Sequence, residues 1–219
     1  MLFRSEADPD ARLVMNDFLV EIDGDGKAMK FLEVAVAMKR RGIPIDGVGF
    51  QCHCYWLGCF ASQKQKMKTL LKRYARYGLD VSFTEMDQGL AYNDRDKLSA
   101  WEAQANDYRT LMEVAVEAPN VHSLIVWGMS DPYSWRPSFD GAIQPLILGD
   151  YLQAKPAYTA MYEVLKKAAE SNSIESVNER SGQLACDKWH TFTYNLAGLL
   201  VDANFKGIVI KNGKKYLQR

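Results

Sequence analysis

The chain has 219 residues, of which 47% are hydrophobic and 25% charged, with 27 basic and 27 acidic side chains and a formal net charge of zero. This composition is typical of a soluble globular protein with one sizeable core, and the balanced charge predicts no attraction to nucleic acid or to acidic membranes. The longest apolar runs are too short for a membrane span, and the first residues do not form a signal peptide.

Strand and helix patterns alternate four times in the first three quarters of the chain. Short apolar runs predict strands at residues 11–17, 47–53, 79–85 and 121–128. Apolar residues at helical spacing predict helices at residues 27–41, 62–77, 94–117 (beginning at Asp94 or Asp96) and 155–169. Ser62 is expected to cap the second helix. Apolar strands joined by helical crossovers predict a parallel α/β sheet.

The last fifty residues have a different character. Residues 170–182 are polar and aperiodic and predict a linker. Beyond them, residues 191–194 and 207–210 alternate as strands do, and Asn212-Gly213 is a strong signal for a two-residue hairpin turn into 214–217. We therefore expect a main domain at 1–169, a linker at 170–182 and a small β appendage at 183–219.

Polar side chains gather at the C-terminal ends of all four predicted strands, where parallel α/β folds place their chemistry. They are Asn16, Asp17, Gln51, His53, Glu85, Asp87, Trp127 and Asp131. Strand alternation sends Glu85 and Asp87 to the same side. A strand end frayed into solvent would explain two acids, but not four successive polar strand ends. The pattern favours a functional site.

The cysteines are Cys52, Cys54, Cys59 and Cys186, too few and too clustered for a disulfide scaffold. Cys52-His53-Cys54 with Cys59 has the residue types of a zinc site, but structural zinc sites favour paired CxxC-like spacings. On a strand, His53 would also face away from both neighbouring cysteines. We expect no metal and interpret the cysteines as small buried hydrophobes.

Five motifs resemble the second half of a glycoside hydrolase family 10 xylanase, in the family's order, over roughly residues 3–168. They are ADPDARLVMNDF, GIPIDGVGFQCH, FTEMD, WGMSDPYSWRP and PLILGDYLQAKPAYTAM. The resemblance implies a partial (β/α)8 TIM barrel, with this chain supplying strands five to eight. It implies no cofactor.

The resemblance assigns the catalytic candidates. Glu85 matches the nucleophile, whose attack on the anomeric carbon would give a covalent glycosyl-enzyme that is hydrolysed with retention. His53 matches the histidine that hydrogen-bonds this nucleophile, and Asp87 matches the acid that orients the histidine. A positioned donor is physically reasonable, because a nucleophilic carboxylate must be ionised.

Substrate contacts are also implied by the resemblance. Gln51 matches a residue that binds sugar hydroxyls, and Trp127 and Trp135 match indoles that form an apolar wall at the cleaved sugar. Phe18 and Leu19 depart from the tyrosine and asparagine usual in the family, which weakens the case for contacts from that loop. Further candidates for substrate contact are Asn16, Tyr133 and Arg136.

One expected part of the site is not in this sequence. The family carries its general acid/base in an Asn-Glu motif on the fourth strand, and a full barrel takes about 250 residues. Asp17 and Asp131 are the only other rim acids. We therefore expect the C-terminal half of a retaining endo-1,4-β-xylanase, inactive alone, with xylan or xylo-oligosaccharides and the other half of the barrel as partners.

Two other functions stay open: a non-catalytic xylan-binding or scaffold protein, and another retaining β-glycosidase on the same barrel. The end of the chain, YNLAGLLVDANFKGIVIKNGKKYLQR, resembles the short C-terminal β modules of secreted bacterial enzymes. That resemblance implies a secreted or surface-attached bacterial parent protein. A plain β-hairpin is the simpler interpretation of the same residues.

Overall fold

The structure is a computed structural model, and it describes residue 8, residues 10–179 and the strand residues 193–195, 200–201, 207–211 and 214–218. Side chains are described as far as residue 171. The chain divides into two compact units, 1–172 and 173–219. The boundary between them falls within the segment predicted as a linker.

The first unit is built on a parallel sheet. Its strands are β1 (Val14–Asp17), β2 (Gly47–Phe50), β3 (His53–Cys54), β4 (Asp80–Gln88) and β5 (Val121–Val126). The longest strand, β4, is central, because β2 and then β3 pair with one side of it and β5 pairs with the other. β1 completes the sheet on the far side of β2. Every pairing in this sheet is parallel, which confirms the predicted α/β class.

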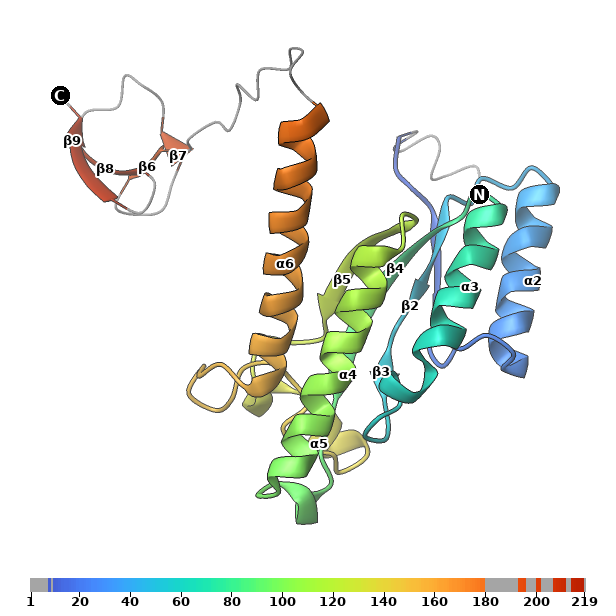
Figure 1. Ribbon diagram of the computed structural model, residues 1–219, viewed down its shortest axis with the longest axis horizontal. Coiled ribbons are helices and arrows are strands. Elements are labelled where there is room, and N and C mark those ends of the chain that lie inside the picture. Colours follow the sequence, from blue (N-terminus) through green and yellow to red (C-terminus); the bar gives the residue numbers. More distant parts are fainter. Residues whose placement is uncertain are drawn as a thin grey trace. The chain divides into compact units, whose positions relative to one another are not determined.

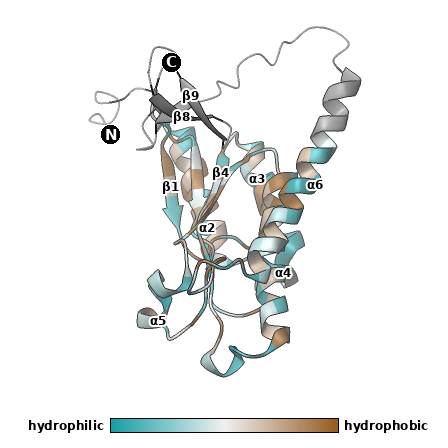
Figure 2. Ribbon diagram, turned by 90° about the vertical axis from the view of Figure 1, so that its left-hand side faces the viewer, coloured by the Kyte–Doolittle hydropathy of each residue, from teal (hydrophilic) through white to brown (hydrophobic). Residues whose placement is uncertain are grey.

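Three long helices connect the strands and run beside the sheet, and a short helix and a further long helix follow its last strand (Figure 1). They are α2 (Gly26–Arg40), α3 (Lys64–Arg76), α4 (Leu98–Glu117), α5 (Arg136–Phe139) and α6 (Pro156–Glu179). Short 3-10 helices are η1 (Ala61–Gln63), η2 (Tyr92–Asp94) and η3 (Asp131–Tyr133). Figure 2, turned by 90°, again separates α3 and α4 from β1 and β4. Within the described part of the chain, no helix combines the length and apolarity that a membrane crossing requires.

Three helix ends differ from the predicted ones. Ser62 does not cap α3: it lies in η1, its hydroxyl donates to the Cys59 carbonyl, and α3 begins at Lys64. α4 begins at Leu98, because the acidic segment before it forms η2 instead. α6 runs to Glu179, across most of the predicted linker, because a polar, aperiodic sequence can still continue a helix that has already formed.

The core lies between the sheet and its helices. Phe50 on β2 packs edge-to-face on Tyr74 of α3, with ring centroids 5.6 Å apart, and stacks on Phe83 of β4 at 6.1 Å. Tyr108 of α4 is fully buried and donates a hydrogen bond of 2.6 Å to the Pro145 carbonyl. Burying each large side chain contributes about 1.5–3 kcal/mol, so this layer holds the strand ends in place.

The second unit is a small antiparallel sheet in the order β7-β6-β8-β9. Its strands are β6 (Thr193–Asn195), β7 (Leu200–Val201), β8 (Gly207–Lys211) and β9 (Lys214–Gln218). Lys211 pairs with Lys214, so a two-residue connection separates β8 from β9, and the predicted hairpin is confirmed. The turn residues Asn212 and Gly213 lie outside the described residues.

Leu111 and Leu98, both on α4, provide a matched test of the packing. Leu111 is fully buried. Leu98 belongs to the apolar residues at helical spacing that predict this helix and its core face, but it is 71% exposed. We expect Leu111→Ala to lower the free energy of unfolding by about 2–5 kcal/mol, because it leaves a cavity. Leu98→Ala should change it by less than about 0.5 kcal/mol. Urea denaturation followed by circular dichroism measures both, and equal losses would contradict this placement of α4.

Candidate active site

Glu85 on β4 is held by a side chain of β1, which lies on the far side of β2. The side-chain amide of Asn16 donates to Glu85 Oε1 at 2.9 Å, and Asn16 Oδ1 accepts from the Thr84 hydroxyl at 2.9 Å. Gly49, on the strand between them, leaves room for this contact, because a Cβ there would collide with the Asn16 side chain. Asn16 therefore contacts the predicted nucleophile, whereas the sequence indicated a contact to substrate.

His53 lies between the two acids of β4. Its Nε2 is 3.3 Å from Glu85 Oε2, and its Nδ1 is 3.0 Å from Asp87 Oδ2. The imidazole is buried, and 14% of the Glu85 side chain remains exposed. The structure thus brings together all three residues that the resemblance marks as catalytic, with Glu85 on the solvent side.

Asp87 is completely buried, and its carboxylate is paired on both oxygens. Oδ1 accepts from an Nη of Arg136 at 2.6 Å, and Oδ2 accepts from the Trp135 indole N–H at 2.8 Å. Buried carboxylates are costly unless charged and hydrogen-bonding partners surround them. Arg136, Trp135 and His53 supply these partners, so the Asp87 carboxylate is held in place behind the imidazole.

Arg136 is 1% exposed and does not face solvent. Its remaining donors bind Asp140, at 2.7 and 3.0 Å, and the Cys54 carbonyl at 3.1 Å. Burial by itself lowers the pKa of Arg136, but the hydrogen bonds to Asp140 and the charge of Asp87 outweigh it and raise the pKa. This corrects the expected substrate contact, because every arm of the guanidinium is already bound inside the protein.

The three aromatic candidates occupy different settings. Trp135 packs its ring against His53, with centroids 5.0 Å apart at an interplanar angle of 63°. Trp127 follows β5 and is 47% exposed, and Tyr133 in η3 is 85% exposed. Within the described residues, neither of these two exposed rings has a ring contact or side-chain hydrogen bond with the Glu85–His53–Asp87 group. Gln51 is partly buried at the end of β2, and its backbone N–H donates to the Asp17 carbonyl.

The remaining rim acids are each paired with a lysine. Asp17 lies 2.9 Å from Lys27, and the buried Asp131 lies 2.9 Å from the buried Lys155. Burial raises the pKa of Asp131 and lowers that of Lys155, in each case against the attraction of the partner. Neither acid contacts the Glu85 group.

Sequence reasoning missed two buried carboxylates beside the site. Glu21 is 4% exposed and accepts the Cys52 backbone N–H at 2.9 Å. Asp107 of α4 accepts backbone N–H groups from three residues of the segment that follows β3, namely Gly58, Phe60 and Ala61. The available signal was an acid in an apolar setting: Glu21 stands between Val20 and Ile22, and Asp107 lies on the buried stripe of α4.

Two of the cysteines differ from their predicted state, and Cys186 lies outside the described residues. Cys54 and Cys59 form a disulfide, whereas Cys52 is buried and free. The two bonded sulfurs and an Asp107 oxygen lie within 4.8 Å of one another. A disulfide sulfur is not a thiolate, and Asp107 is already bound to backbone N–H groups, so this group does not have the chemistry of a metal site.

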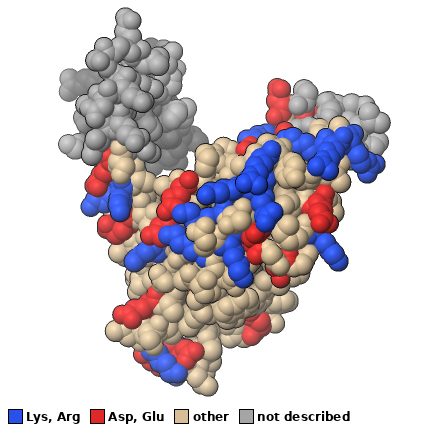
Figure 3. All heavy atoms as spheres, turned by 45° about the vertical axis from the view of Figure 1, so that its right-hand side comes forward, with Lys and Arg blue, Asp and Glu red and all other residues tan. Residues whose placement is uncertain are grey.

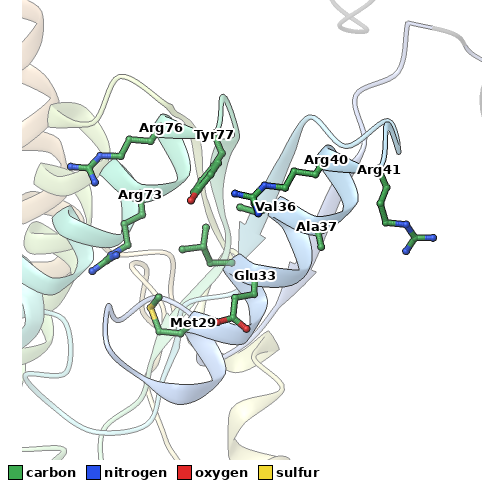
Figure 4. Close-up of a pocket in the computed structure, with 10 residues that line it drawn as sticks. Met29, Glu33, Val36, Ala37, Arg40, Arg41, Arg73, Arg76 and Tyr77 are labelled. Carbon is green, nitrogen blue, oxygen red and sulfur yellow. The ribbon is translucent and has the colours of Figure 1, made fainter.

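A groove of about 530 Å³ lies elsewhere, between α2 and α3 (Figure 4). Arg40, Arg73 and Arg76 line it beside Tyr77, and Figure 3 shows the basic side chains gathered on this part of the surface. Several of them belong to the last turns of α2 and α3, where positive charge stabilises the helix C-terminus. The groove contains none of the candidate catalytic residues.

A carboxylate backed by a buried histidine and aspartate, at the C-terminal edge of a parallel sheet, is the kind of site that barrel glycosidases use. The family model for glycosyl hydrolase family 10 matches residues 3–164, and the chain belongs to this family.

Several relatives support this assignment. The chain is 33% identical over 168 residues to endo-1,4-beta-xylanase B of Thermotoga neapolitana, covering 76% of this chain and 47% of that protein. It is 34% identical to endo-1,4-beta-xylanase 5 of Pyricularia oryzae, covering 74% of this chain and 40% of that protein. The crystal structure of native xylanase 10B from Thermotoga maritima superposes with a TM-score of 0.71 at 30% identity, covering 78% of this chain and 51% of that one. The chain spans about half the length of the relatives it matches.

The Arg136–Asp140 pair predicts a pH dependence of stability. Burial alone raises the pKa of Asp140, but hydrogen bonding from Arg136 outweighs it and lowers the pKa. The stabilisation is therefore complete above the ordinary aspartate pKa of about 3.9 and is lost as pH falls through the lowered folded value. We expect Asp140→Asn to be less stable than the wild type near neutral pH and to lose less stability on acidification. Urea denaturation of the wild type and of Asp140→Asn, from neutral pH down to below the ordinary aspartate pKa, measures this difference. Stability profiles that run parallel over this pH range would contradict the prediction.

Proposed function

We propose that this chain supplies the nucleophile side of a retaining endo-1,4-β-xylanase site that acts on xylan or xylo-oligosaccharides. The observation that carries the proposal is the Glu85 carboxylate, held by Asn16 and His53 at the C-terminal edge of the sheet. Membership of glycosyl hydrolase family 10 and the names of the relatives support the substrate class.

In this proposal Glu85 attacks the anomeric carbon of the bound sugar. The glycosidic bond breaks as the carboxylate–carbon bond forms, and water later cleaves the glycosyl-enzyme with overall retention. The ionised carboxylate is the form that attacks. Asn16 holds one oxygen, and the other, Oε2, lies beside His53.

Asp87 acts through His53. Its carboxylate lies 3.0 Å from Nδ1 and limits rotation of the ring, so that Nε2 stays next to Glu85. Trp135 and Arg136 hold Asp87 in turn. These residues position the nucleophile and need no direct contact with the sugar.

Substrate contacts are proposed for groups that remain accessible beside Glu85. The exposed ring of Trp127, directly after β5, offers an apolar face to the C–H side of a sugar, and the partly buried Trp135 and Gln51 are further candidates. Tyr133 is the most exposed of these candidates and the most peripheral in this proposal. Arg136 is excluded from it, because its donors are already used.

A proton donor for the leaving group must come from outside this set of residues. Retaining enzymes place a second carboxyl group about 5–5.5 Å from the nucleophile. Among the described rim acids, Asp17 and Asp131 are paired with lysines. We propose that an acid/base from the other half of a barrel completes the site.

We also propose, from the resemblance of the last 26 residues alone, that the parent protein is a secreted or surface-attached bacterial enzyme. The antiparallel sheet of the second unit is compatible with a short β module. Detection of the native protein in the culture medium or on the cell surface would support this, and its recovery only from the cell interior would oppose it.

An activated probe tests Glu85 without the missing acid. Dinitrophenolate leaves without protonation, so we expect 2,4-dinitrophenyl 2-deoxy-2-fluoro-β-xylobioside to label the chain at Glu85. Intact-mass and peptide mass spectrometry measure the adduct. Glu85→Gln should abolish labelling, whereas Asp17→Asn should not. A folded chain that stays unlabelled, or labelling that survives Glu85→Gln, would refute the nucleophile and favour a non-catalytic binding protein.

Natural substrate should give a different outcome. Because xylan has a poor leaving group, we expect the 219-residue chain alone to release no measurable xylo-oligosaccharides. Chromatography of the products from beechwood xylan measures this. Release that is abolished by Glu85→Gln would contradict the need for an acid from elsewhere, and labelling by the matching 2-fluoro-cellobioside instead of the xylobioside would indicate another retaining β-glycosidase.

A further inference from the structure

The backbone between β2 and β3 changes its pairing with β4. Phe50 is opposite Phe83, but His53 is opposite Asp87. The chain advances three residues from Phe50 to His53, whereas β4 advances four over the same stretch of the pairing. In an unbroken ladder His53 would be opposite Met86. A shift of one residue sends side chains to the other face of a sheet, so this change decides which residues of β4 the imidazole meets.

The extra residue lies in β4, because β4 also gains one residue on β5 between Phe83 and Met86. Opposite it, the chain from Phe50 to His53 passes through a residue with unusual backbone geometry. Cys52 has φ +60°, in the left-handed region that residues with a side chain rarely adopt. Cys52 is also fully buried, so its N–H cannot be satisfied by bulk water. A left-handed, buried, non-glycine residue persists only where the surrounding structure holds it.

Glu21 provides such a hold. Its Oε1 accepts the Cys52 N–H at 2.9 Å across 31 residues of sequence, and the Glu21 side chain is itself buried. Glu21 and His53 line the same small cavity, of about 30 Å³, together with Leu19 and Ile22. Glu21 and His53 therefore lie close to each other beside this turn.

We propose that Glu21 is a positioning residue for the active site: by holding the left-handed turn at Cys52, it keeps His53 between Glu85 and Asp87. The functional meaning rests on the proposed role of Glu85, whereas the structural statement does not. Glu21 does not touch the reacting atoms in this proposal. It acts through the backbone of the residue that separates Gln51 from His53.

The alternative is that Glu21 merely satisfies a buried N–H and contributes to stability. The two accounts differ in what happens to His53 when the acceptor moves. If Glu21 positions His53 by holding the turn at Cys52, moving the Glu21 carboxylate away from the Cys52 N–H displaces the imidazole from Glu85 and Asp87. If it only stabilises, His53 stays in place in every folded variant.

The imidazole signals of the 219-residue chain provide the readout. The chain has three histidines, and the spectrum of His53→Gln identifies the His53 signals in ¹⁵N-resolved NMR. His122 is an internal reference, because it is about half exposed and lies beside Asp80 at the other end of β4. We expect Glu21→Asp, which shortens the side chain by one methylene, to shift the His53 nitrogens more than those of His122. Glu21→Gln keeps an acceptor oxygen and should restore the wild-type signals.

A second substitution tests the link through the turn. Glycine adopts a positive φ without steric cost, so Cys52→Gly should reduce the shift that Glu21→Asp causes. Glu33→Ala, at an acid on α2 far from this turn in the chain, is the matched control and should leave His53 unchanged. His53 signals that are unmoved in folded Glu21→Asp, or moved equally with and without Cys52→Gly, would overturn the proposal.

If Glu21→Asp does not fold, Glu21→Ala, which removes the acceptor, takes its place, with Glu21→Gln as its control. Displaced His53 signals in Glu21→Ala together with wild-type signals in Glu21→Gln support the proposal. Wild-type signals in both variants, or displaced signals in both, overturn it. The measurement needs neither substrate nor turnover. Failure of the xylanase proposal would appear as an unlabelled Glu85 and would leave the NMR result intact.

Discussion

The buried charge of Asp87 is the constraint on which the rest of the site depends. A fully buried carboxylate is tolerated only with charged and hydrogen-bonding partners, and here they come from β3, from the Trp135 loop and from α5. Removing any one partner leaves the others holding an incompletely paired charge, which costs more than one ordinary hydrogen bond. The pairing therefore fixes the loop after β5 against the end of β4, and it fixes His53 beside Glu85.

Two irregular stretches of backbone bring His53 next to Glu85 and Asp87. β4 changes register against β5 between Phe83 and Met86, and the neighbouring chain turns at Cys52. Beyond that turn, the Cys54–Cys59 disulfide and the buried Asp107 hold the segment that leads into α3. Regular strands would give a more uniform ladder but a different set of neighbours for the imidazole. The departures from regular geometry lie where the candidate chemistry is, as is common at functional sites.

Charge pairing separates the acids of the rim into two groups. Asp17 and Asp131 are engaged by lysines, whereas Glu85 contacts an amide and an imidazole and keeps part of its surface exposed. An anion held by such partners, next to solvent, is suited to attack an electrophilic carbon and poorly suited to donate a proton. In the proposed function, the described residues supply one of the two carboxylates of the mechanism, and the chain spans about half the length of its relatives.

The sequence by itself determined the alternation of strands and helices, the parallel sheet and the gathering of Glu85, His53 and Asp87, because hydrophobic periodicity and motif order are local and written along the chain. Only the tertiary structure decided that Arg136 binds Asp87 instead of facing substrate, and that Asn16 binds Glu85. It also decided that Cys54 bonds Cys59, and that Glu21 and Asp107 accept hydrogen bonds from backbone N–H groups. These contacts join residues that are mostly far apart in sequence. Their existence depends on strand register and burial, which no local pattern encodes.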